Sequence, residues 1–128
     1  MGVSTQTVQR TTTSIVTQQG VEFFKAVQTD TTPGSWQVLI NETVGSGKQI
    51  NILSVAITCR IDGVMEVFID STLVGSGRTG PAEKNIGFVW TPFKAAADGE
   101  AIEVKFRAHS GKPIDKVEAY LQARELTI

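Results

Sequence analysis

The sequence predicts an all-β protein: an antiparallel β-sandwich, for which a jelly roll is one arrangement, with an extended N-terminal arm. Apolar and polar residues alternate with a period of two from about Val21 onward, as they do in strands that have one buried face. Gly, Pro and Asp-Gly turn signals interrupt the alternation at short intervals, and a helical period is almost absent. Roughly seven to nine short strands in two packed sheets satisfy this pattern.

The first 20 residues differ in composition from the rest of the chain. They contain six Thr, four Gln and two Ser, and Arg10 is their only charged residue. Such a segment is too polar to form a core, but its Thr residues suit β-pairing with a partner edge. We therefore divide the chain into an arm, 1–20, and a sandwich domain, 21–128. Within the arm we expect an edge strand at 11–17 (TTTSIVT) that orders against the body or a neighbouring chain.

The first strands of the domain are expected at 21–28 and 36–42. Pro33 and Gly34 lie between them and favour a type II turn, whose second and third positions suit Pro and Gly. The second strand places three apolar residues on the face that we expect in the core: Trp36, Val38 and Ile40.

The segment 50–61 (INILSVAITCRI) predicts a strand that is longer than usual. Its twelve residues would span about 40 Å, so we expect a bend or bulge near Ser54. Asp62 and Gly63 follow and form the strongest hairpin signal in the chain. They predict that 64–70 forms a strand that returns beside 50–61. The core face of the returning strand is Met65, Val67 and Ile69.

A tight reversal then leads to a short strand around Leu73 and Val74. The next strand, 84–93, is expected to end near Pro92, because Pro cannot donate to the hydrogen-bond ladder. A loop with room for one helical turn follows at 94–101.

The last two strands have the clearest alternation. The segment 101–109 alternates strictly, whereas 115–125 (DKVEAYLQARE) also contains many residues that favour a helix. The alternation of the second segment is unbroken over eight positions, so we predict a strand there too. The expected inward residues are Ile102, Val104, Phe106, Ala108, Val117, Ala119, Leu121 and Ala123.

Two stretches resemble part of a phosphate-binding loop: VGSGKQ at 44–49 and VGSGRT at 74–79. The P-loop pattern requires a Gly where this chain has Glu42 and a hydroxyl residue where it has Gln49. The residues after the first stretch alternate like a strand, whereas a P-loop leads into a helix. We therefore interpret both stretches as turns in which four glycines take positive φ: Gly45, Gly47, Gly75 and Gly77.

The sequence shows no catalytic or metal-binding pattern. His109 is the only His, and Cys59, the only Cys, lies in an apolar run and is expected to be a small buried hydrophobe. Glu66 and Asp70, two strand steps apart on one face, lie about 13 Å from each other, too far to share a proton. We predict no enzyme, no cofactor and no metal site.

Composition limits the partners and the location. A net charge of −1 and a pI of about 5.8 provide no positive field that would attract nucleic acid. The chain has no apolar run of membrane length and no signal-peptide pattern, so we expect no membrane partner and synthesis in a cytoplasm.

Three aromatic residues are candidates for a binding surface. Trp36 and Trp90 are in phase with apolar neighbours, so we expect both in the core. Tyr120 is out of phase with its apolar neighbours and is the better candidate for an exposed interface residue.

The run from Ile50 to Glu125 carries a resemblance, in CRIDGVMEVFIDSTLVGSGRTGPAEKNIGFVWTPF and GEAIEVKFRAHSGKPIDKVEAYLQARE. It looks like small structural proteins of tailed bacteriophages and is most similar to the β-sandwich proteins that decorate or cement the capsid. The resemblance implies an accessory virion protein, often trimeric, over junctions between subunits of the major capsid protein.

A cement protein gains affinity from many modest contacts, and a Thr-rich arm can add a strand to a neighbour's edge. The candidate interface residues are Arg10, Thr11, Thr12, Thr13, Ile15, Val16 and Tyr120. Two other functions fit the same architecture: a tail, baseplate or fibre component of a phage virion, and a carbohydrate-binding β-sandwich. A stable trimer in solution favours a virion role, and saturable glycan binding favours the carbohydrate module.

Overall fold

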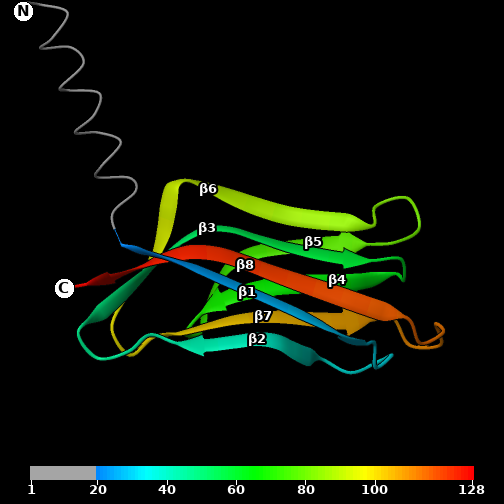
Figure 1. Ribbon diagram of the computed structural model, residues 1–128. Helices are drawn as coiled ribbons and strands as arrows, with labels where there is room; N and C mark the ends of the chain where they lie inside the picture. Colours follow the sequence, from blue (N-terminus) through cyan, green and yellow to red (C-terminus); the bar gives the residue numbers. More distant parts are fainter. Residues whose placement is uncertain (1–19) are drawn as a thin grey trace, which may run out of the picture.

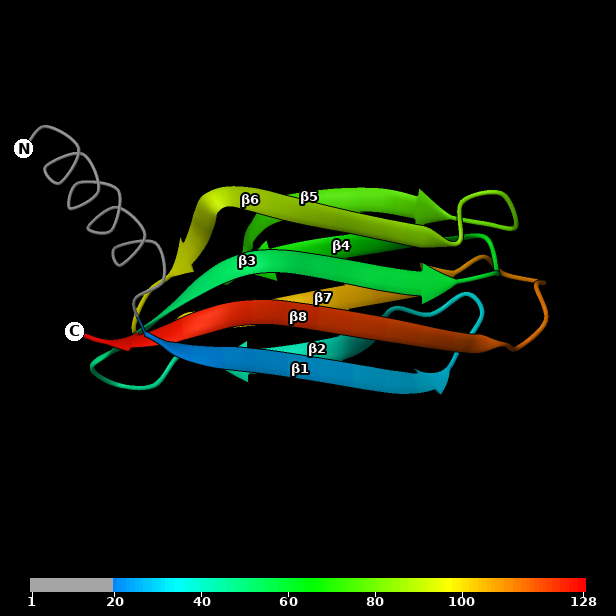
Figure 2. The same ribbon diagram turned by 45° about the horizontal axis from the view of Figure 1, so that its top comes forward.

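The computed structural model describes residues 20–128, which form two stacked four-stranded antiparallel sheets and no helix (Figures 1 and 2). The strand order is β1-β8-β3-β6 in one sheet and β2-β7-β4-β5 in the other. This arrangement confirms the predicted β-sandwich. The strands are β1 Val21–Asp30, β2 Gln37–Thr43, β3 Lys48–Cys59, β4 Gly63–Ile69, β5 Thr72–Thr79, β6 Asn85–Ala96, β7 Ala101–Ala108 and β8 Lys116–Thr127.

The pairing of the strands makes the sandwich a jelly roll. The first strand pairs with the last, β2 pairs with β7, β3 with β6 and β4 with β5. The chain is therefore one long hairpin whose tip is the β4–β5 turn, and it is folded so that β8 also pairs with β3 and β7 with β4. Every connection except β4–β5 crosses from one sheet to the other.

The core lies between the sheets and is built by the predicted alternation. All eight residues expected to face inward from β7 and β8 are buried, so the strand prediction for 115–125 is confirmed. The core face of β4 follows the same rule, whereas β3 follows it only from Val55 onward, because Ile50, Asn51 and Ile52 are all buried. The largest fully buried side chains are Phe106, Ile40, Ile50, Ile52, Ile57, Met65, Ile102 and Leu121.

The hairpin prediction at Asp62 and Gly63 is wrong. These residues connect β3 to β4, which belong to different sheets and do not pair. Gly63 has no positive φ, and a Cβ at this position would lie 2.3 Å from Cζ of Phe106. Position 63 is therefore a Gly because a neighbouring ring fills the space that a side chain would need. The hairpin of the structure joins β4 to β5 and turns at Asp70, whose φ is 53°.

Register shifts explain the bend in β3 and the path of β6. The long β3 shifts register between Ile52 and Ser54, as predicted. Opposite this shift β6 turns a corner (Figure 1) and continues through Pro92 to Ala96, so the expected end of the strand is wrong. Pro is accommodated because β6 is an edge strand and residues 90–93 have no partners in its register with β3.

The shift in β2 lies between Val38 and Ile40 and reverses the phase of the strand. Leu39 and Ile40 are both buried, whereas Trp36 and Val38 are exposed by 41% and 50%. The prediction that Trp36 and Val38 face the core is therefore wrong. Trp90 is half-buried and packs against the core as expected.

The glycine stretches are not nucleotide loops, and only one of them is a turn. Of the four glycines expected to take positive φ, only Gly47 does, at 72°, so the expectation for Gly45, Gly75 and Gly77 is wrong. Gly34, in the predicted type II turn, has a φ of 83°. Gly75 and Gly77 instead lie inside β5, which extends from Thr72 to Thr79. A Cβ on them would lie 3.0 Å from Phe88 and 2.6 Å from Ile86, so they make room for the side chains of β6.

The segment 94–101 also differs from expectation, because its first residues continue β6 and a turn without a helix follows at Ala97–Glu100.

Candidate functional site

Titratable side chains do not converge anywhere in the part of the chain that the structure covers. Residues 20–128 contain no group of three or more His, Cys, Asp or Glu that could hold a metal ion. Cys59 is buried, and burial raises the pKa of its thiol. His109 is exposed at the end of β7. In the same range no helix is long and apolar enough to cross a membrane.

The acidic residues of β4 and its flanking turns serve separate local roles. Asp62 pairs with Lys112, with 3.1 Å between the carboxylate and Nζ. Asp70 accepts a hydrogen bond from the backbone N–H of Ala101 at 2.8 Å. Neither carboxylate is directed at a shared site: Asp62 forms an ion pair, and Asp70 accepts a hydrogen bond from the backbone.

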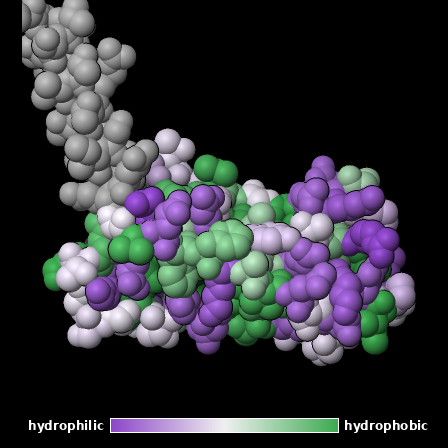
Figure 3. Space-filling model, viewed as in Figure 1, coloured by the Kyte–Doolittle hydropathy of each residue, from purple (hydrophilic) through white to green (hydrophobic). Residues whose placement is uncertain are grey.

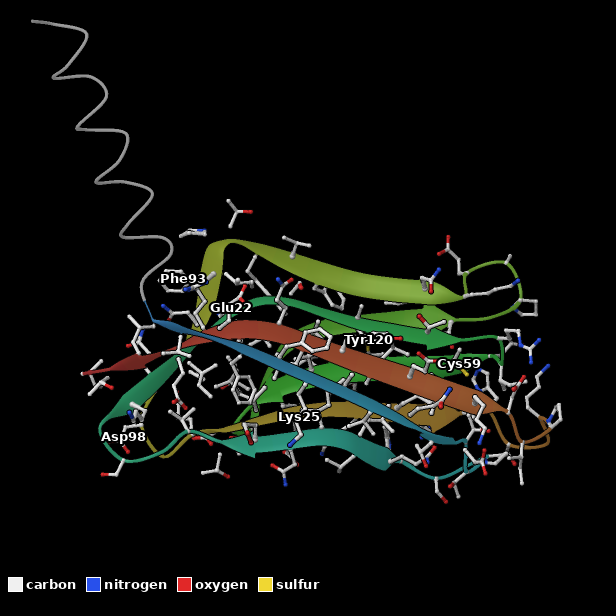
Figure 4. All side chains as sticks on the ribbon, in the orientation of Figure 1. Glu22, Lys25, Cys59, Phe93, Asp98 and Tyr120 are labelled. Carbon is white, nitrogen blue, oxygen red and sulfur yellow. The ribbon has the colours of Figure 1, made fainter. Side chains whose placement is uncertain are left out.

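The outer face of the β1-β8-β3-β6 sheet carries Tyr120 near its centre (Figure 4). The phenol ring lies 6.3 Å from the ring of Phe24, which is 65% exposed. The Tyr120 hydroxyl donates to the Glu118 carboxylate, and this bond raises the pKa of Tyr120. The residues beside Tyr120 in register are small: Ala26, Ala56 and Gly87. Tyr120 thus lies on the outer face that its phase predicted, but it is half-buried rather than exposed.

A hollow of about 430 Å³ lies at one end of this sheet. It forms beside the register shift of β3, where Leu53 is the extra residue. Figure 3 shows that this side of the molecule mixes hydrophobic and hydrophilic areas rather than presenting one continuous apolar patch. The residues that line the hollow are Glu22, Phe23, Phe24, Leu53, Gln122 and Ala123.

The outer face of the β2-β7-β4-β5 sheet carries aromatic rings covered by cations. The guanidinium of Arg107 lies 4.8 Å from the centre of the Trp36 ring, and Nζ of Lys105 lies 5.0 Å from the centre of the Phe68 ring. Leu73 is a further exposed apolar residue on β5. Sequence reasoning missed Trp36 as a surface residue, because nothing local to the sequence marked the bulge in β2 that reverses its phase.

The remaining predicted interface residues lie outside the described range: Arg10, Thr11, Thr12, Thr13, Ile15 and Val16. The described chain begins at Gly20, whose carbonyl accepts a hydrogen bond of 2.8 Å from Arg124. Gly20, the first described residue, is therefore anchored at the end of β8 that also borders the hollow.

No protein-family model and no curated protein matches the sequence. Solved structures do match. A chain in the acidic stable capsid of Helicobacter pylori bacteriophage KHP30 is similar over 84% of this chain and 94% of that chain, with a TM-score of 0.50 and 10% identity. The shared feature is the fold.

Two other viral proteins align more loosely. One is VP2 in the subviral particle of infectious bursal disease virus, with a TM-score of 0.46, 9% identity, and 84% of this chain and 33% of that chain covered. The other is in the virus-like particle of the giant freshwater prawn Macrobrachium rosenbergii extra small virus, with a TM-score of 0.38, 14% identity, and coverage of 80% and 78%.

Proposed function

We propose that this protein is a structural component of a virus particle. More specifically, we propose an accessory protein of a tailed phage that binds at junctions between major capsid subunits and stabilises the shell. The observation that carries the proposal is the match to the phage KHP30 capsid chain, 94% of which is covered. The KHP30 chain consists of little more than one such sandwich, which supports a capsid role for a small protein of this fold.

The surfaces support a role in contacts rather than in catalysis. Aromatic residues lie on both outer faces of the sandwich: the exposed Phe24 and the half-buried Tyr120 on one, and the exposed Trp36 on the other. Aromatic residues of this kind dominate the binding energy of protein interfaces. A body with a contact face on either side is suited to bridging neighbouring subunits, and a homotrimer would multiply these modest contacts.

We further propose that the arm grips the shell or a neighbouring copy. Its Thr-rich segment 11–17 would add a strand to an exposed sheet edge, where backbone hydrogen bonds supply most of the affinity. Arg10, Ile15 and Val16 would supply the side-chain contacts.

Particles assembled with and without the protein test the shell role. Particles that lack it should release their genome at a lower temperature, and purified protein added back should restore the resistance. Dye access to the genome during heating measures the change, and imaging locates the added density. Density on the tail, or unchanged heat resistance, would contradict the proposed role. The mass in solution tests the trimer.

Three variants test the contacts. A chain without residues 1–19, which retains Gly20 and its bond to Arg124, should keep its circular dichroism spectrum but lose particle binding. Tyr120→Ser should weaken binding several-fold, whereas Tyr120→Phe keeps the ring and serves as the matched control. Normal particle binding by the truncated chain would show that the arm is not part of the interface. Equal binding by the two Tyr120 variants would show that the Tyr120 ring does not contribute to it.

A further inference from the structure

The side chain of Arg107 is held on the surface by an aromatic ring rather than by an acidic group of residues 20–128. Its guanidinium stacks on Trp36, and it makes no ion pair or side-chain hydrogen bond with any residue from 20 to 128. Stacking orders the planar group but leaves its N–H donors at the rim available. Such a group is prepared to bind a carboxylate.

A second arginine lies on the same face. Val64 is paired with Arg107 on one side and with Arg78 on the other, so the two arginines flank it across three adjacent strands. Two strand spacings separate their backbones by about 10 Å. Arg78 likewise makes no ion pair or side-chain hydrogen bond within the described range. We name the set Trp36, Arg107, Val64 and Arg78 the cationic row.

Among residues 20–128, no carboxylate forms an ion pair with either arginine of this row. In the next row of the sheet Lys105 lies opposite Glu66, so its charge has a counterpart in register. Asp62, the acidic residue just before β4, is already paired with Lys112 at 3.1 Å. Both arginines of the cationic row therefore lack an ion-pair partner among residues 20–128, in a chain whose net charge is −1.

A hollow of about 190 Å³ adjoins Arg107 and limits the size of what can enter. Its other lining residues are Gly34, Ala108, His109 and Ser110. Sites for drug-sized ligands occupy about 300 to 1,000 Å³, so this hollow suits a single side chain rather than a nucleotide or a large sugar. The side chains of His109 and Ser110 also have no hydrogen-bond partner among residues 20–128.

We propose that the cationic row binds an acidic segment of a partner protein. Carboxylates two residues apart on an extended segment lie about 7 Å from each other, within reach of both guanidinium groups. One carboxylate would bind Arg107 at the mouth of the hollow, the other would bind Arg78, and an apolar side chain between them would cover Val64. The source of the segment, a neighbouring shell protein, rests on the proposed function.

Titration of the isotope-labelled full chain with a short peptide tests the row independently of any particle. The probe is Glu-Val-Glu-Val-Glu, and its Gln-Val-Gln-Val-Gln counterpart is the neutral control. The acidic peptide should cause saturable NMR shifts at the Trp36 indole and at the amides of 107–110, and added salt should weaken its binding. The neutral peptide should cause none.

Single substitutions identify the residues responsible. Arg107→Gln and Arg78→Gln should each lower the affinity by about three- to tenfold. Lys94→Gln is the matched control, because Lys94 is an exposed cation on β6, in the other sheet, and makes no ion pair within residues 20–128. It should leave the affinity unchanged.

The outcomes separate the row from the shell role. The proposed binding site is wrong if the acidic peptide causes no saturable NMR shifts, or causes them away from the cationic row. It is also wrong if Lys94→Gln lowers the peptide affinity as much as the arginine substitutions do. These results count whether or not the protein binds particles. A sulfated hexasaccharide that binds at the row while the acidic peptide does not also overturns it, in favour of a glycan. If the protein binds the acidic peptide at the cationic row but does not bind particles, the proposed peptide site is supported and the proposed role in the shell is contradicted.

Discussion

At the residue scale, the ring of Phe106 occupies the space that a side chain at position 63 would need. A Cβ on Gly63 would lie 2.3 Å from Cζ of Phe106 and 2.8 Å from the carbonyl oxygen of Arg107. Phe106 is fully buried and the carbonyl belongs to the backbone, so neither atom can move aside easily. The smallest residue is thus required here by packing and not by its dihedral angles.

Gly63→Ala should therefore lower the free energy of unfolding by about 1–3 kcal/mol, the usual cost of overpacking a core. Denaturation with urea, followed by circular dichroism, measures the change. Gly45→Ala is the control, because its Cβ would meet only the side chain of Lys48, at 3.5 Å, and Gly45 has no positive φ. This substitution should stay within about 0.5 kcal/mol of the parent. Equal midpoints for the two variants would show that the ring moves aside.

At the element scale, the edges of the two sheets differ in how readily they can accept a further strand. The edge strands are β1, β2, β5 and β6. Register shifts interrupt the pairing of β2, β5 and β6, whereas β1 pairs with β8 without a shift from Val21 to Asp30. A strand that adds to this sandwich should therefore choose β1.

Asp115 ties the start of β8 to the end of β3. Its carboxylate accepts the backbone N–H of Lys116 at 2.7 Å and pairs with Arg60 at 3.1 Å. These two interactions, the first being the larger, hold the pKa of Asp115 below its usual value. A depressed pKa stabilises the folded state above the unfolded pKa of about 3.9, and this contribution is lost as the pH falls through the folded value.

Asp115→Asn should therefore lower Tm at pH 7 by a few degrees at most, because the pair is exposed to solvent. The difference from the parent protein should shrink as the pH falls below about 4. Thermal denaturation from pH 3 to 7 measures both effects. Glu83→Gln, at an exposed carboxylate without an ion pair within residues 20–128, should not change Tm at pH 7. A constant difference across the pH range would contradict the assignment.

At the scale of the whole molecule, the two ends of the domain meet. Val21 is paired with Glu125, and the N–H of Ile128 donates to the carbonyl of Gly47 at 2.9 Å. The opposite end of the sandwich carries the exposed β7–β8 loop. A short linker could thus join the ends without crossing the core, and the loop offers a place to open the chain.

A circular permutant of residues 20–128 tests this geometry. Ile128 is joined to Gly20 through a short Gly/Ser linker, and the new ends lie between Ser110 and Gly111. It should fold with the same circular dichroism spectrum and a similar dependence of stability on urea concentration. A permutant opened between Leu121 and Gln122, inside β8, is the control and should not fold. Loss of structure in the first permutant would contradict the meeting of the ends.

Local sequence patterns predicted which segments form strands better than they predicted which strands pair with each other. Alternation identified the buried residues of β4, β7 and β8, because each has one face on the core throughout its length. It failed in β2, where one extra residue reverses the phase and exposes Trp36. The pairing of Val21 with Glu125 depends on contacts between distant strands that no short motif encodes. The surface site at Trp36 was missed because no local pattern in the sequence marks the bulge in β2 that exposes this residue.

The pairing of the first strand with the last has a consequence for how the protein is made. While the nascent chain leaves the ribosome, β1 has no partner until β8 has emerged, and β2 must wait for β7. Among the strands of residues 20–128, only β4 and β5 are both consecutive in the chain and paired with each other. We therefore expect assembly to begin at this hairpin and to proceed outward in both directions, with the exposed apolar side chains of Val21 and Phe24 among the last to find their places.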